Sequence, residues 1–162
     1  MELLGRHHIS FDQLRSAAIR CHALDLSAHH LFMDGTHLDG VEKTRHVYEE
    51  LFTVELLALA ISLRTKFYQG ADSSKTAKYV SASGLLYKYK GTKEETVSFS
   101  LKDVCDKIIH AERISRYLAP GIQKATTSIY GSNPIDRSTW ELSISISMFC
   151  EAVLNWIHSI DR

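Results

Sequence analysis

The residues best suited to chemistry lie in one segment, residues 101–111, with the sequence LKDVCDKIIHA. Asp106 and His110 are four residues apart, so on a helix their side chains share one face, one turn from each other. A carboxylate in that position orients an imidazole and raises its pKa, which suits a general acid or base near neutral pH. Arg113, three residues further on, would add a cation. The structural alternative is a histidine at the edge of the core that is held by Asp106.

A second charged candidate, Arg64, lies at the end of a very apolar stretch. A guanidinium in apolar surroundings needs a carboxylate or carbonyl partner. The same planar group binds a phosphate, or a carboxylate at an interface, through two hydrogen bonds. If the helices that carry them are neighbours, Arg64, Asp106 and His110 would form an anion-binding or RNA-cleaving pocket. The other interpretation of Arg64 is a structural ion pair.

A third candidate is a surface in which tyrosine alternates with lysine, formed by Tyr87, Lys88, Tyr89 and Lys90. Such a strand could stack the bases of single-stranded nucleic acid. The same surface could bind a protein, or it could simply be the amphipathic side of a hairpin.

The nine histidines do not form a metal-binding pattern. His7-His8 and His29-His30 are adjacent pairs, whose side chains diverge on regular structure, and the remaining histidines lack the spacing of a zinc-binding helix. The sequence also has no glycine-rich phosphate loop and no nucleophile elbow. We therefore expect neither a metal nor a cofactor.

The elements that must position these residues follow from periodicity and capping signals. Apolar spacing and two capping boxes predict helices over 11–32, 41–69 and 100–117, the third ended by Pro120-Gly121, and a last helix over 148–160. Alternating β-branched and aromatic residues around polar turns predict hairpins over 86–99 and 126–146. The sequence therefore predicts a mostly helical α+β fold in one domain, ordered helix, helix, hairpin, helix, hairpin, helix.

The second predicted helix is apolar on most of its circumference. One side carries residues at three- and four-residue spacing, and leucines flank that side, so we expect a central helix wrapped by the rest of the fold. The spaced residues are Val47, Leu51, Val54, Leu57, Ala58, Ile61 and Phe67, and the flanking ones are Leu56, Leu59 and Leu63. The last helix has one apolar stripe, from Met148 to Ile160, which must dock on another surface.

Length and composition limit the class of protein. The 162 residues suffice for one core, and 19 basic residues balance 19 acidic ones, which argues against a protein that wraps duplex nucleic acid. The three cysteines, Cys21, Cys105 and Cys150, are an odd number without close pairing, and we expect reduced thiols in the core. The sequence shows no signal peptide and no run that could span a bilayer, so we expect a cytoplasmic protein with no membrane contact.

The order of the motifs resembles that of a known group. A hairpin leads into a helix with Lys107-Ile108-Ile109-His110-Ala111, and then come Tyr130-Gly131-Ser132, Trp140-Glu141 and a helix with Phe149-Cys150-Glu151-Ala152-Val153. Small, mostly uncharacterised bacterial and phage proteins show a similar order. These proteins are similar to the HEPN superfamily, whose helical domains occur in toxin–antitoxin, abortive-infection and other conflict systems. The resemblance covers roughly residues 41 to 160 and implies a HEPN-like helical domain with hairpin insertions.

The resemblance implies two alternative functions. Active HEPN ribonucleases carry an Arg and then a His on one helix and need no metal; here His110 matches the His, but Lys102, Asp103 and Asp106 precede it instead of a well-spaced Arg. The first function is therefore a non-catalytic immunity protein or antitoxin that binds and neutralises a toxin encoded nearby. The second is a metal-independent ribonuclease, with RNA as its partner, in which His110 is the acid or base, Asp106 orients it, and Arg64 or Arg113 stabilises the phosphate. A homodimer formed through helices is compatible with either.

Overall fold

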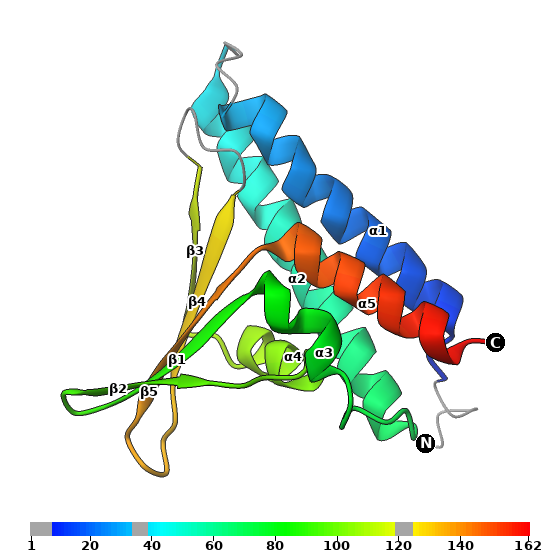
Figure 1. The fold of residues 1–162 in the computed structure, drawn as a ribbon. Helices are drawn as coiled ribbons and strands as arrows, with labels where there is room; N and C mark the ends of the chain where they lie inside the picture. Colours follow the sequence, from blue (N-terminus) through cyan, green and yellow to red (C-terminus); the bar gives the residue numbers. More distant parts are fainter. Residues whose placement is uncertain (1–7, 34–38, 119–124) are drawn as a thin grey trace, which may run out of the picture.

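The computed structural model describes residues 8–33, 39–118 and 125–162, which form an α+β fold with the helices on one side of a single sheet (Figure 1). The helices are α1 (Phe11–Ala28, continued by a π-helical turn at His29–Met33), α2 (Val41–Tyr68), α3 (Ala77–Val80, continued by a 3-10 turn at Ser81–Ser83), α4 (Leu101–Ile109) and α5 (Ile146–Ile160). The strands are β1 (Gly84–Lys90), β2 (Lys93–Val97), β3 (Arg113–Tyr117), β4 (Thr126–Ser132) and β5 (Thr139–Ile144). The predicted α+β class with mostly helical content is confirmed.

The long helices pack around α1. The predicted capping box is formed: the Ser10 side chain accepts from the backbone N–H of Gln13, and the Gln13 side chain accepts from that of Ser10. α1 packs against both α2 and α5 (Figure 1). The α5 stripe is buried in this contact, with Trp156 edge-on to Phe11 at 6.4 Å between ring centroids. The stripe is thus covered within the chain, apart from Ile160, which is 44% exposed.

The three cysteines lie in this core. Cys21, Cys105 and Cys150 are all buried free thiols, as the sequence predicted. Burial raises the pKa of the Cys105 thiol well above its ordinary value. These thiols are therefore small apolar side chains of the interior.

Both predicted hairpins are present, and they join into one antiparallel sheet with the strand order β2-β1-β5-β4-β3. The joining pair is β1 with β5, in which Leu86 lies opposite Leu142. Trp140, Leu142 and Ile144 point to the helices and are buried, whereas Glu141 and Ser143 between them face outward and are half-buried. This alternation confirms the buried face that the sequence of β5 predicted.

The predicted third helix is too long. α4 ends at Ile109, and residues 113–117, predicted to be helical, form the edge strand β3, which pairs with β4. The segment RISRY alternates in burial, so Ile114 and Arg116 point inward, and this alternation fits a strand better than a helix. Pro120-Gly121 lies outside the described residues. The last helix begins slightly earlier than predicted, at Ile146, because the side chain of Ser145 caps it.

The side of α2 that faces the core is not the one with the regular spacing. Its fully buried residues include Phe52, Leu56, Leu59 and Leu63, which contact α1 and α4. The expectation of a helix wrapped on most sides is wrong, because α2 is apolar on two sides and the fold covers only one. The opposite side, which we call the α2 seam, consists of Val47, Leu51, Val54, Ala58 and Ile61. Four of its side chains are exposed by 61% (Val47), 47% (Leu51), 62% (Val54) and 49% (Ile61).

A buried ion pair links the sheet to the helices. The Arg116 guanidinium of β3 donates to the Asp25 carboxylate of α1, and the side chains are only 6% and 4% exposed. The same carboxylate accepts from the backbone N–H of Ser147 in α5 at 2.8 Å. Arg116 also donates to the Tyr48 hydroxyl of α2 at 2.8 Å, and that hydroxyl donates to the carbonyl of Leu24. Burial raises the pKa of Tyr48 to about 12, so this hydroxyl keeps its proton at neutral pH.

Candidate functional site

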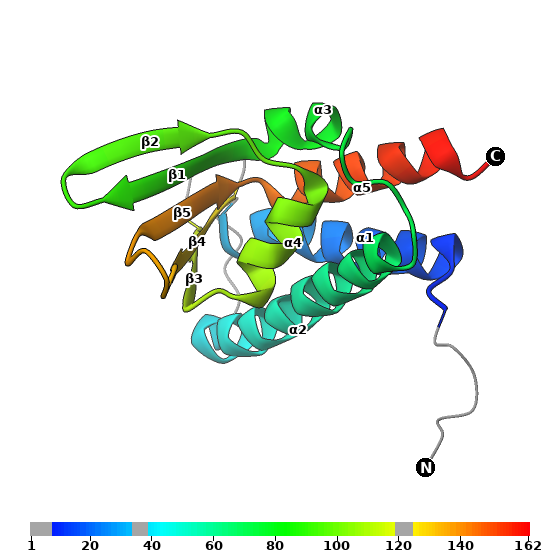
Figure 2. The ribbon, with the colours of Figure 1, turned by 90° about the horizontal axis from the view of Figure 1, so that it is seen from below.

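Two of the predicted site residues come together where α4 lies between α2 and the sheet (Figure 2). The Arg64 guanidinium contacts the Asp106 carboxylate as an ion pair, and both side chains are mostly buried. Arg64 also donates to the Tyr68 hydroxyl at 2.6 Å, which lowers the pKa of Tyr68. The guanidinium is therefore already engaged by two side chains of its own chain.

His110 is not part of this pair. It follows the last residue of α4, and its backbone N–H donates to the carbonyl of Asp106 at 3.0 Å, while its side chain is exposed. Its imidazole makes no hydrogen bond or ion pair with a described residue. The predicted pairing of Asp106 with His110 is thus not formed, because the carboxylate faces Arg64 and the helix ends before the histidine.

Arg113 does not lie on the same helix as Asp106, where the sequence predicted it to add a cation beside His110. It is the first residue of β3, and its guanidinium lies over the Tyr130 ring, 4.3 Å from the centroid. The cross-strand register places Arg113 opposite Tyr130 on the outer face of the sheet. Arg113 therefore belongs to the sheet surface rather than to a cluster with His110.

The four residues of the tyrosine–lysine strand do not share one surface. Tyr87 and Tyr89 stack on the outer face of the sheet, with 6.5 Å between ring centroids. Lys88 points to the opposite face, toward α4, and Lys90 is exposed at the end of β1. Because side chains alternate along a strand, the tyrosines and lysines act on different sides of the sheet.

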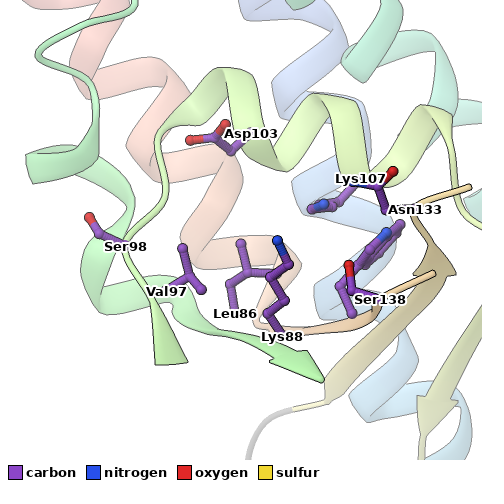
Figure 3. A pocket seen from close by; sticks show the side chains of 9 residues that line it. Leu86, Lys88, Val97, Ser98, Asp103, Lys107, Asn133 and Ser138 are labelled. Carbon is purple, nitrogen blue, oxygen red and sulfur yellow. The ribbon is translucent and has the colours of Figure 1, made fainter. Parts of the chain in front are cut away.

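A cavity of about 230 Å³ lies between β1 and α4, on the side that Lys88 faces (Figure 3). Lys107 of α4 reaches into it, and its ammonium lies 4.3 Å from the centroid of the Trp140 ring. The lining residues are Leu86, Lys88, Val97, Ser98, Asp103, Lys107, Asn133, Ser138 and Trp140. A second hollow, which includes Asp106, His110 and Glu112, shares Lys107, Asn133 and Trp140 with the first.

The charges around this cavity have distinct partners. Partial burial is the main cause that lowers the pKa of Lys107; the charge of Asp103 raises this pKa, and the charge of Lys88 lowers it by a smaller amount. The Asp103 carboxylate accepts from the backbone and the hydroxyl of Ser100 at 2.7 and 2.8 Å, which fixes it as the second half of a capping box. Lys88 lies 3.4 Å from Asp136, whose pKa is lowered to about 2, chiefly by hydrogen bonds from Ser138.

Sequence reasoning missed this cavity. The sequence places Lys107 only in the motif that contains His110, and it places Lys88 only in the surface in which tyrosine alternates with lysine. Alternation along the strands could have placed Lys88 of β1 and Trp140 of β5 on the inner face of the sheet. The two side chains line one cavity only because β1 pairs with β5, and the sequence does not show that pairing.

Within residues 8–33, 39–118 and 125–162, no three histidine, cysteine, aspartate or glutamate residues gather as a metal site would require. None of the helices in this part of the chain has the length and apolar character needed to cross a membrane. Comparison of the chain with protein-family models, with curated proteins and with solved structures found no match.

Proposed function

We propose that this protein is a non-catalytic binding protein of a bacterial conflict system, an immunity protein or antitoxin, and that it binds its toxin through the α2 seam. The observation that carries this proposal is the exposure of Val47, Leu51, Val54 and Ile61 on one face of a long helix. A contiguous apolar surface of this kind marks an interaction site more often than a solvated face. The setting in a conflict system rests on the resemblance to the HEPN superfamily.

The spacing within the seam indicates the shape of the partner. Successive members from Val47 to Ile61 are separated by four, three, four and three residues, which is the repeat of helices that pair side by side. Beside the seam, an apolar hollow of about 440 Å³ lies between α1 and α2, with Leu24 and Leu31 on its α1 side. An amphipathic helix of the partner fits a surface with both features.

The charges beside the seam suit a basic residue on the partner helix. Glu50 and Glu55 flank the seam on either side. Glu55 already forms an ion pair with Arg20 of α1 at 3.0 Å. The Glu50 side chain is 67% exposed, so a basic residue that flanks the apolar side of the partner helix can pair with it.

Replacing Val54 with glutamate tests the seam. A charge at the centre of an apolar interface loses its water on binding, so we expect binding to weaken by at least about 100-fold. The measurement is isothermal titration against the product of the adjacent gene. Because Val54 is 62% exposed, the variant should unfold at the same temperature as the wild type.

The matched control is Ile135→Glu, which introduces the same charge at a residue that is 92% exposed in the loop between β4 and β5. It should bind like the wild type. If the Val54→Glu variant binds as tightly as the wild type, the seam is not the binding surface. If the wild type does not bind, the product of the adjacent gene is not the partner. If the free protein is a dimer that Val54→Glu dissociates, a second copy occupies the seam.

The arrangement of Arg64, Asp106 and His110 supports the absence of catalysis. We expect total bacterial RNA to stay intact when it is incubated with the protein in EDTA, because Arg64 is engaged by Asp106 and the His110 imidazole has no carboxylate beside it. Gel electrophoresis of the RNA is the measurement, with His110→Ala as the control. Cleavage by the wild type that His110→Ala abolishes would contradict this proposal and establish the ribonuclease alternative.

A further inference from the structure

We infer that the cavity between β1 and α4 is a binding site for a small molecule that carries one anionic group, a carboxylate or a phosphate. This inference is independent of the proposed function, because none of the residues of the α2 seam lines the cavity.

Two ammonium groups converge on this cavity from different elements. Lys88 points into it from β1 and Lys107 from α4, and their nitrogen atoms face the same space (Figure 3). Lys107 forms no ion pair with a described residue, and its ammonium lies over the face of the Trp140 ring. Two like charges that the fold holds near each other repel, and an anion between them would remove that repulsion.

The carboxylates near the lysines offset part of their charge, because Asp136 pairs with Lys88 and the charge of Asp103 raises the pKa of Lys107. Asp136 lies 3.4 Å from Lys88 but is not part of the cavity wall, and its carboxylate accepts from the backbone and the hydroxyl of Ser138. Asp103 is held by Ser100 in the capping box at the start of α4. Among the described residues, no carboxylate forms an ion pair with both lysines, so an anion from outside the chain can bind between them.

A neutral donor completes the anion-binding end. Asn133 lines the cavity, and its side-chain oxygen accepts from the backbone N–H of Ile135 at 3.0 Å. Its amide nitrogen has no hydrogen-bond partner among the described residues and can donate to a ligand. The site therefore offers Lys88, Lys107 and Asn133 as donors to one anionic group.

The remaining walls restrict the rest of the ligand. Leu86, Val97 and the Trp140 ring are apolar, and Asp103 would repel a second negative charge. The volume of about 230 Å³ is smaller than that of a typical site for a drug-sized ligand. The ligand is thus a small molecule with an apolar or aromatic body and a single acidic group.

The test is isothermal titration of the full chain with phenyl phosphate, benzoate and inorganic phosphate. We expect at least one of these probes to bind, and we expect Lys88→Met and Lys107→Met each to weaken its binding about tenfold or more, because each variant removes a charged donor. Lys90→Met, at the exposed end of the same strand, should bind like the wild type. Tighter binding of phenyl phosphate than of benzoate assigns a phosphate ligand, and the reverse assigns a carboxylate.

The thermal stability of the variants separates a binding role from a structural one. Without a probe, Lys107→Met should unfold at the same or a higher temperature than the wild type, because it removes a half-buried charge that lies near Lys88. The bound probe should raise the unfolding temperature of the wild type and not that of the variant. Because the pKa of Lys107 is lowered, its ammonium loses its proton at a lower pH than that of an exposed lysine. As the pH is raised, the affinity for the probe should therefore begin to fall before ordinary lysines deprotonate.

Two outcomes would overturn the inference. One is that none of the three probes produces heat or a shift in the unfolding temperature of the wild type. The other is that a probe binds with the same affinity to the wild type, Lys88→Met and Lys107→Met, which would place its binding elsewhere.

Discussion

Replacing Arg116 with leucine should lower the free energy of unfolding by about 3–5 kcal/mol, a large part of the stability of a typical domain. The substitution leaves the Asp25 carboxylate, whose side chain is 4% exposed, without its cation. It also removes the hydrogen bond to Tyr48 and the stacking of the guanidinium on the Phe52 ring, whose centroid lies 3.8 Å away. The measurement is urea denaturation followed by circular dichroism.

The control for this prediction is Arg113→Leu on the same strand. Arg113 is exposed on the outer face of the sheet, so its loss should change the free energy of unfolding by less than about 0.5 kcal/mol. Arg116→Leu combined with Asp25→Leu should destabilise the protein less than the sum of the single substitutions, because no unpaired charge remains buried. A loss below about 1 kcal/mol for Arg116→Leu alone would show that the pair is not required.

Gly84→Ala should lower the free energy of unfolding by about 3 kcal/mol or more, at the upper end of the range for overpacked sites. A Cβ atom at Gly84 would lie 2.0 Å from the carbonyl oxygen of Ser143 and 2.8 Å from the Cα of Ile144. Both atoms belong to the backbone of β5, which cannot turn aside as a side chain can. The two strands would have to separate at the pair that joins the hairpins. Thermal unfolding measures the effect.

Gly131→Ala is the matched comparison. Its added Cβ would lie 2.2 Å from the Trp140 ring, which is a side chain and can shift at a smaller cost. We therefore expect Gly84→Ala to be the more destabilising of the two. If Gly84→Ala unfolds at the temperature of the wild type, the close pairing of β1 with β5 at this point is wrong.

The local elements could be predicted from the sequence where caps and periodicity agree. α1 starts at Phe11 and α4 at Leu101, as their capping boxes indicate, and α2 ends within one residue of the expected position. The strand at 113–117 was predicted as helix because a segment of five residues is short enough to fit the pattern of the preceding amphipathic helix as well. The joining of two hairpins into one sheet was missed because the pairing of Gly84 with Ile144 connects distant parts of the sequence and leaves no local pattern.

Only the part of the candidate site that depends on a single contact could be predicted from the sequence. Opposite charges on two apolar helices were enough to suggest that Arg64 and Asp106 could share a pocket, and the structure pairs them. The sequence could not show which side of α2 faces the core, because the helix is apolar both on the side of Leu56 and on the opposite side, which carries Val54. The cavity of Lys88 and Lys107 depends on the fold as a whole.

The position of β5 in the middle of the sheet governs the order in which the chain can fold as it is synthesised. β5 lies between β1 and β4, yet it follows the other four described strands in the sequence. Until it leaves the ribosome, β1 and β4 each present an unpaired edge, and such edges favour aggregation. The sheet and α5, which begins directly after β5, therefore complete the structure in one late step, and chaperones that bind exposed strands have their main opportunity before it.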